Sequence, residues 1–70
     1  MGPPIVLKGT VRRDHGCVIL ETGERRWALT GRAAARLVDG EQVTVRGRPV
    51  AVPAGCDAAS GLALRASPGS

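Results

Sequence analysis

A near absence of aromatic residues is the strongest constraint on how this chain can fold. Its 70 residues include one Trp and neither Phe nor Tyr, so Val, Leu, Ile and Ala must supply the hydrophobic core. A domain of this size buries only about 60% of the surface that its unfolded chain exposes. A thin aliphatic core suits a compact all-β barrel whose interior is filled by side chains. We therefore expect one small domain without a deep ligand cavity.

Three β-strands are predicted in the first half of the chain. The β-rich run over residues 5–12 has Gly9 at its centre, where a glycine commonly marks a bend of a long strand around a small barrel. After a polar turn, a second strand is expected over residues 17–22. Gly23 then indicates a tight hairpin into a third strand over residues 26–30. The three strands form an antiparallel meander.

The pattern then changes from strand to helix and back. Residues 32–38 are mostly strong helix formers, so we expect about two helical turns there, with Thr30 as the cap and Gly40 just beyond the end. Residues 42–48 alternate strictly, which predicts a strand. Its inward positions are Val43, Val45 and Gly47, and its outward positions are Thr44, Arg46 and Arg48.

The rest of the chain is predicted to complete a two-stranded hairpin. Pro49 cannot donate a ladder hydrogen bond, so residues 50–52 are expected to be an edge or a bent continuation of the preceding strand. A loop rich in turn residues follows over 53–61, and a last strand over 62–65. Residues 1–66 thus form the single domain, and residues 67–70 a disordered tail.

This order of elements resembles that of the oligonucleotide/oligosaccharide-binding (OB) fold. An OB-fold is a five-stranded barrel with one helix between its third and fourth strands. The segments that resemble those of OB domains are Gly9–Val11, Leu37–Gly47 and the ending Gly61–Leu64. The chain is similar to small uncharacterised bacterial OB-fold proteins in which one Cys opens the second strand and another precedes the fifth. The resemblance implies a small five-stranded OB-like barrel and a binding module, and it implies no cofactor.

Cys17 and Cys56 lie 39 positions apart, at places that a small barrel can bring together. They form either a disulfide, which geometry favours, or two reduced thiols, which a cytoplasmic location favours. The first residues lack the basic start and apolar run of a signal peptide, so we expect a cytoplasmic location, with a secreted mature fragment as the alternative.

The same region offers little for a metal or for catalysis. His15, Cys17, Cys56 and Asp57 could in principle bind zinc, but no Cys-x-x-Cys pair supports this, and we expect no metal. A Cys nucleophile with His15 as its base lacks an orienting third group. We therefore expect no enzymatic activity.

Arginines are the candidate ligand-binding residues. The net charge is +4, and OB domains that bind single-stranded nucleic acid use cations and aromatic side chains on strands two and three and on the adjoining loops. The positions that match are Arg12, Arg13, Arg25, Arg26, Trp27, Arg46 and Arg48. Trp27 alternates with Leu29, which favours a core position over base stacking. Binding of nucleic acid should thus be weak and unspecific.

The leading hypothesis is a non-enzymatic module for an anionic partner, either single-stranded nucleic acid or an acidic protein, with no membrane association. The alternative is a structural or protein-interaction domain that docks a partner, or a second copy of itself, through an edge strand or through residues 49–61. A third alternative is a molybdate-binding module, based on the spacing of Leu37, Gly40 and Val43.

Overall fold

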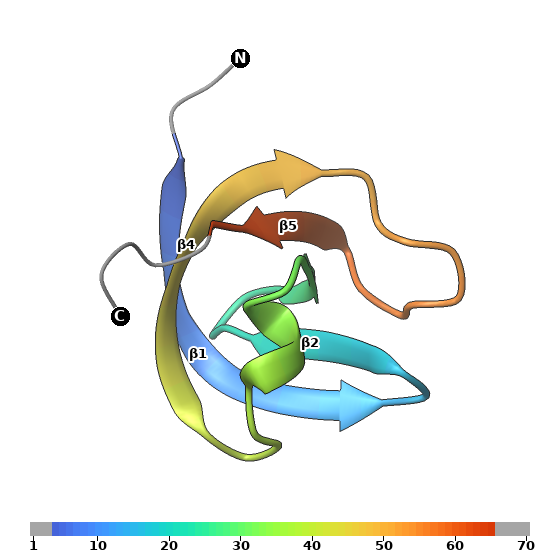
Figure 1. The fold of residues 1–70 in the computed structure, drawn as a ribbon, viewed down its shortest axis with the longest axis horizontal. Coiled ribbons are helices and arrows are strands. Elements are labelled where there is room, and N and C mark those ends of the chain that lie inside the picture. Colours follow the sequence, from blue (N-terminus) through green and yellow to red (C-terminus); the bar gives the residue numbers. More distant parts are fainter. Residues whose placement is uncertain (1–3, 66–70) are drawn as a thin grey trace.

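The computed structural model describes residues 4–65 and consists of five β-strands with one short turn of 3-10 helix. Figure 1 shows the strands curving around a common interior. In chain order the elements are β1 (Ile5–Asp14), β2 (Cys17–Glu21), β3 (Arg26–Thr30), η1 (Ala34–Arg36), β4 (Gln42–Val50) and β5 (Ser60–Leu64). Within this part of the chain, no helix is long and apolar enough to cross a membrane.

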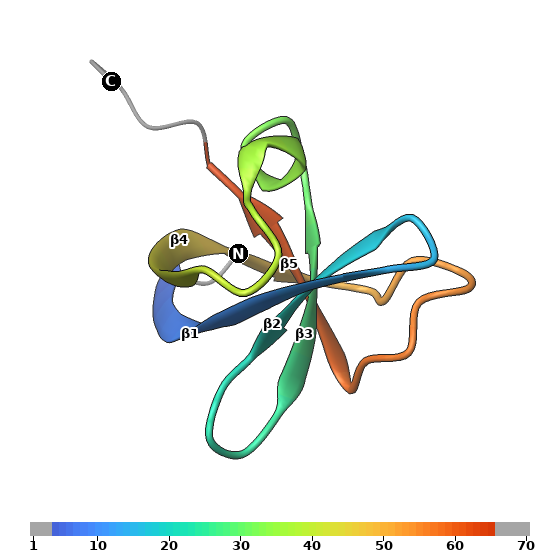
Figure 2. The same cartoon turned by 90° about the horizontal axis from the view of Figure 1, so that it is seen from below.

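The strands close into a barrel in the order β1-β2-β3-β5-β4. All neighbours are antiparallel except β3 and β5, which run parallel. The long strand β1 has two partners: its first half pairs with β4 and its second half with β2, which closes the barrel. Figure 2 shows this long strand passing across the others. The all-β, OB-like barrel expected from the sequence is therefore confirmed.

Two glycines lie where the barrel backbone approaches itself most closely. Gly9 lies beside Thr10, the residue at which β1 changes partner from β4 to β2. A Cβ atom at Gly9 would collide with the carbonyl oxygen of Glu21, and one at Gly47 with the carbonyl oxygen of Ala63. The bend predicted at Gly9 is present, and β4 has a comparable close approach at Gly47.

Aliphatic side chains from every strand fill the barrel. Val11, Leu20 and Leu62 are fully buried, and Val18, Leu29, Ala34 and Val45 complete the buried cluster. Trp27 packs against this cluster from its margin and is only half-buried. The core is thus aliphatic, as the composition requires, and Trp27 is a partly buried neighbour of it.

The first hairpin is a two-residue turn. His15 and Gly16 both have positive φ, 50° and 79°, between the paired residues Asp14 and Cys17. This is the backbone of a type I′ turn, whose twist matches that of the flanking strands.

The expected helix of two turns is wrong in extent. Only Ala34–Arg36 form a single 3-10 turn, and Leu37 is already extended, with ψ of 142°. Thr30 does not cap it, because Thr30 ends β3 and Gly31 follows with φ of 99°. Gly40 also has positive φ, at 86°, but in the turn that Glu41 N closes onto Val38 O. The carbonyl oxygens of Ala35 and Leu37 accept from Arg13 Nη1 instead of from helical N–H groups, so the chain leaves the helical path after one turn.

The strand after this turn continues past Pro49, as expected, but it ends at Val50 rather than Val52. β4 continues through Pro49 to Val50, and from Arg48 onward its register partners belong to β5 alone. One side of this segment is therefore unpaired within the described residues, which is where proline is tolerated. β5 begins at Ser60, two residues before the predicted start. The predicted tail, residues 67–70, lies outside the described residues.

Candidate functional site

The predicted ligand-binding residues do not converge on one surface. Alternation along the strands places Arg12 and Arg26 on the outer face of β1, β2 and β3, whereas Arg13 projects inward at one end of the barrel. Arg25 and Trp27 lie together at the β2–β3 hairpin. Arg46 and Arg48 occupy the outer face of β4. The partners that each guanidinium group has at these locations determine whether it is free to bind a ligand.

Arg12 and Arg26 each face a carboxylate. Arg12 Nε donates to Glu21 Oε1 at 3.2 Å, and the two side chains are 54% and 38% exposed. Arg26 Nη1 lies 3.9 Å from Asp57 Oδ2, and Glu21 is also its register partner in β2. Cations and acids therefore alternate across this face, so their fields largely cancel for a ligand that approaches from outside.

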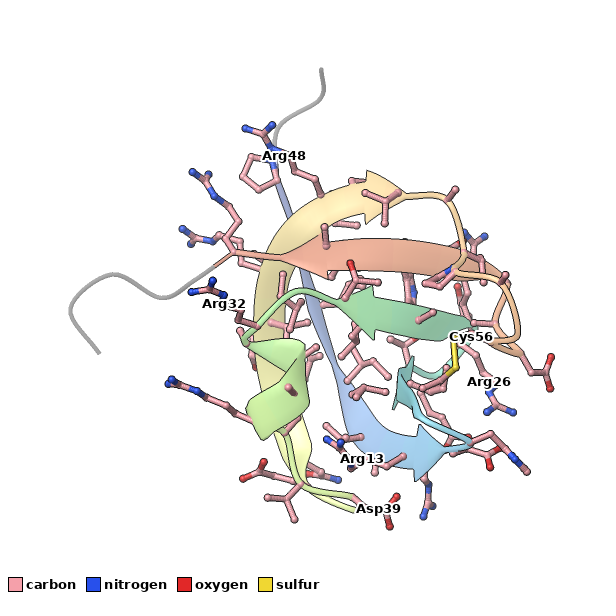
Figure 3. The ribbon with its side chains drawn as sticks, turned by 45° about the vertical axis from the view of Figure 1, so that its right-hand side comes forward. Arg13, Arg26, Arg32, Asp39, Arg48 and Cys56 are labelled. Carbon is pink, nitrogen blue, oxygen red and sulfur yellow. A yellow bond between two sulfur atoms is a disulfide. The ribbon has the colours of Figure 1, made fainter. Side chains whose placement is uncertain are left out.

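Arg13 has a structural role in this arrangement. Its Nη1 donates to the carbonyl oxygen of Leu37 at 2.9 Å and more weakly to that of Ala35 at 3.4 Å. Its backbone N–H donates to Asp39 Oδ1 at 2.8 Å. Figure 3 shows Arg13 and Asp39 at the end of the barrel beside η1. Arg13 thus holds the segment between η1 and β4 against β1.

Arg25 lies over the ring of Trp27. Its guanidinium carbon lies 5.7 Å from the centre of the indole ring, within the range of a cation–π contact. Its Nη1 also donates to Ser60 Oγ at 3.1 Å. Trp27 therefore has the core on one side and Arg25 nearby, which leaves it poorly placed to stack on a nucleic-acid base.

Arg46 and Arg48 differ from the other predicted arginines, because neither has an ion pair or a side-chain hydrogen bond within residues 4–65. Both are exposed, and Figure 3 shows Arg48 extending away from the barrel. Across the sheet, Arg46 is the register partner of Val6, and Arg48 that of Ala63.

Two further cations belong to this surface and were not predicted. Lys8 projects outward from β1 beside Thr44, and Arg65 follows β5, where its backbone N–H donates to Arg46 O at 3.1 Å. We call Lys8, Arg46, Arg48 and Arg65 the basic face. Alternation along β1 is enough to place Lys8 outward. Only the β1–β4 register shows that Lys8, opposite Thr44, is a diagonal neighbour of Arg46. The half of β1 that pairs with β4 (Ile5–Thr10), β4 itself and β5 contain no Asp or Glu.

The disulfide connects β2 to the loop between β4 and β5. Cys17 and Cys56 are bonded, with their Cα atoms 5.8 Å apart, and Figure 3 shows the bond beside the loop. In this state neither sulfur is a thiolate that could bind zinc. Among the described residues, no group of three or more His, Cys, Asp or Glu side chains is placed to hold a metal ion.

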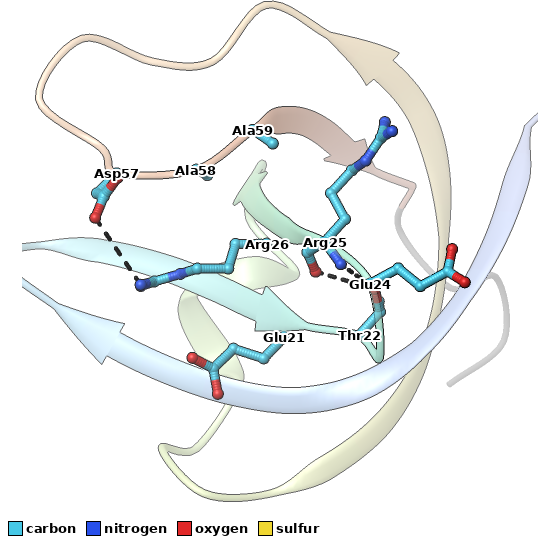
Figure 4. A pocket seen from close by; sticks show the side chains of 8 residues that line it. All are labelled: Glu21, Thr22, Glu24, Arg25, Arg26, Asp57, Ala58 and Ala59. Atoms are coloured by element: carbon cyan, nitrogen blue, oxygen red, sulfur yellow. Dashed lines mark hydrogen bonds and ion pairs between the residues drawn. The ribbon is translucent and has the colours of Figure 1, made fainter.

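A shallow groove of about 460 Å³ separates this loop from the β2–β3 hairpin. Figure 4 shows Arg26 extending along it towards Asp57, with Glu21 on the opposite side. The residues that line it are Glu21, Thr22, Glu24, Arg25, Arg26, Asp57, Ala58 and Ala59. Three acids and two arginines give it no dominant charge, so the groove does not favour an anionic ligand.

A family model described as "Protein of unknown function (DUF5818)" matches residues 8–67, which include both cysteines and the whole basic face. The chain belongs to the DUF5818 family. No curated protein and no solved structure gives a significant match. On the described surface of this DUF5818 domain, the basic face is a cluster of cations that form no ion pair.

Proposed function

We propose that this DUF5818 domain is a non-enzymatic OB-fold binding module for an anionic polymer, with single-stranded nucleic acid as its ligand. The observation that supports the proposal is the basic face. Lys8, Arg46 and Arg48 project from the adjacent strands β1 and β4, Arg65 directly follows β5, and none of the four has an ion pair among the described residues. The OB-like strand order adds support, because barrels of this kind bind extended ligands along their surface.

The spacing of the four cations suits a chain of anions better than a single small anion. Neighbouring strands in a sheet lie about 4.8 Å apart, and residues two apart along a strand about 6.7 Å. Arg46 lies between Val6 and Arg65 across the sheet, and Arg48 is two residues further along β4. The charges are thus spread over a surface that several phosphates can contact at once.

Like charges placed this close repel one another and slightly destabilise the folded state. On the opposite face, each arginine has a carboxylate nearby that offsets this cost. On the basic face, a bound polyanion would remove the repulsion and release its own counterions. The contrast between the two faces is the reason for assigning binding to β1, β4 and β5 rather than to β2 and β3.

The same surface determines the character of binding. Base stacking on aromatic side chains contributes about 1 to 3 kcal/mol per base in single-strand-binding proteins. The basic face has no aromatic residue, and its exposed apolar side chains are Val6 and Val50. Binding should therefore consist mainly of phosphate contacts, with little sequence preference and strong salt dependence.

The proposal is tested by titrating a fluorescein-labelled oligodeoxythymidine with the protein at several salt concentrations. For single strands, the slope of log K against log salt is about −0.7 per phosphate contact, so Arg46→Gln/Arg48→Gln should reduce the slope by about 1.4. The affinity at low salt should fall about tenfold or more.

Arg12→Gln/Arg26→Gln is the matched control, because it removes the same two charges from the opposite face. Its exposed ion pairs contribute only about 0 to 1 kcal/mol each, so the variant should fold. It should bind almost as well as the unchanged protein. Equal losses in the two variants would mean that net charge alone is sensed, and no binding by the unchanged protein at low salt would reject the proposal.

A further inference from the structure

Two apolar residues on the outer face of the barrel are buried by something other than the core. Ile19 and Ala28 are register partners in β2 and β3, and each is only 1% exposed. They alternate with Val18, Leu20 and Leu29, which point into the core cluster, and they do not belong to that cluster. Arg12 is the register partner of Ile19 on this face, and a segment outside the sheet completes the cover of the pair.

The β4–β5 loop, residues 51–59, is that segment. Cys56 of the loop is bonded to Cys17, which precedes Ile19 by two residues on the same face of β2. At its other end, Ala59 N donates to the carbonyl oxygen of Arg26, which precedes Ala28 by two residues on β3. The loop is thus attached on both sides of the Ile19–Ala28 pair and spans the face between them.

Apart from the disulfide, the middle of this loop is weakly attached. The hydrogen bond from Cys56 N to Pro53 O is internal to the loop. The ion pair of Asp57 with Arg26 is 3.9 Å long, and the Asp57 side chain is 98% exposed, so the pair contributes little. The described registers of the barrel involve no residue between 51 and 59. The strands can therefore stay paired when the loop moves.

We propose that Cys17–Cys56 is a site of thiol–disulfide exchange, and that its reduction releases the β4–β5 loop and exposes Ile19 and Ala28. The co-reactant is a dithiol. One of its thiolates attacks a protein sulfur and breaks the protein disulfide, and its second thiolate then displaces the other protein thiolate from the mixed disulfide. Two electrons pass to the protein, which gains two protons and ends with two thiols, and the dithiol becomes a disulfide. Both cysteines are only half-buried, so a reductant can reach them.

The chain offers a direct test because Ile5 and Ile19 are its two isoleucines. With both δ1 methyl groups labelled, a soluble paramagnetic agent broadens each NMR signal according to its exposure. Reduction with dithiothreitol should increase the broadening of Ile19 several-fold. The broadening of Ile5, which packs against the core near the far end of β1, should not change.

The variant Cys17→Ser/Cys56→Ser lacks the cross-link and should show an exposed Ile19 with and without dithiothreitol. If that variant does not fold, the comparison of Ile19 broadening between the oxidised and the reduced unchanged protein is the test. An Ile19 signal that stays protected after mass spectrometry shows two free thiols would overturn the proposal. So would loss of the native Ile5 shift on reduction, because the disulfide would then hold the whole fold rather than the loop. Neither result depends on the basic face.

Discussion

At the scale of single residues, Gly9, Gly47 and Gly61 have no room for a side chain, and Gly9 and Gly47 are the most crowded. Gly47 lies in β4 between Ile5 of β1 and Leu64 of β5, and a Cβ there would meet the backbone of Ala63 and the side chain of Leu62. Gly9 has the same relation to Glu21 and Leu20. Because the nearest atoms are backbone, they cannot move aside without disturbing the ladder.

Replacing Gly47 with Ala should therefore lower the free energy of unfolding by about 2 to 4 kcal/mol, through overpacking and backbone displacement. Gly23 is the matched control, because its φ is not positive and a Cβ added there would have no atom within 4 Å. Gly23→Ala should change stability by less than about 1 kcal/mol. Urea unfolding followed by Trp27 fluorescence measures both. Similar losses in the two variants would contradict this account of β4.

The sequence predicts the outward positions of the candidate site but not its long-range contacts. Alternation correctly predicted that Arg46 and Arg48 face outward and that Val45 faces the core. It could not predict that Arg13 would donate to the carbonyl oxygen of Leu37, just after η1, because that contact joins residues 24 positions apart through the closure of the barrel. Lys8 and Arg65 were missed for the same reason, since strand register brings them beside β4.

At the scale of elements, the β1–β2 hairpin contains the one described non-glycine residue with positive φ. His15, with φ of 50°, occupies the first position of the turn, where an imidazole side chain is less suited than an amide. Asn-Gly is the strongest two-residue sequence for this type of turn.

His15→Asn should accordingly raise the free energy of unfolding by about 0.5 to 1 kcal/mol, whereas β-branched His15→Val should lower it by at least that amount. His15 is exposed, and its contact with Asp14 is on the surface, so other effects of the change are small. Equilibrium unfolding in urea measures both variants. A destabilised Asn variant would argue against a type I′ turn at these residues.

Elements were predicted better in their order than in their extent. The five strands follow from alternation and from the turn residues between them. The length of the helix was overestimated from the high helix propensity of residues 32–38. The same residues must lead the chain from β3 to β4 across the end of the barrel, and on this path they form one turn. Ala34 alone of the turn is buried, and Leu37 is extended where a second helical turn would begin. Tertiary geometry overrides local propensity in such a short connection.

At the scale of the whole molecule, charge is distributed unevenly. The six acidic residues lie in the second half of β1, in β2, and in the turns and loops, whereas the four cations of the basic face lie on β1, on β4 and directly after β5. A net charge of +4 understates this separation. The barrel thus has one electrically balanced face, covered by the disulfide-linked loop, and one basic face that is open.

Chemical-shift mapping by NMR shows which face of the barrel the oligonucleotide contacts. Amide shifts are recorded while unlabelled oligodeoxythymidine is added to the labelled protein at low salt. We predict that the largest changes occur around Lys8, Arg46, Arg48 and Arg65, and that residues 17–21 and 26–30 change little. Changes concentrated on β2 and β3, or no changes at saturating oligonucleotide, would contradict the assignment of binding to the basic face.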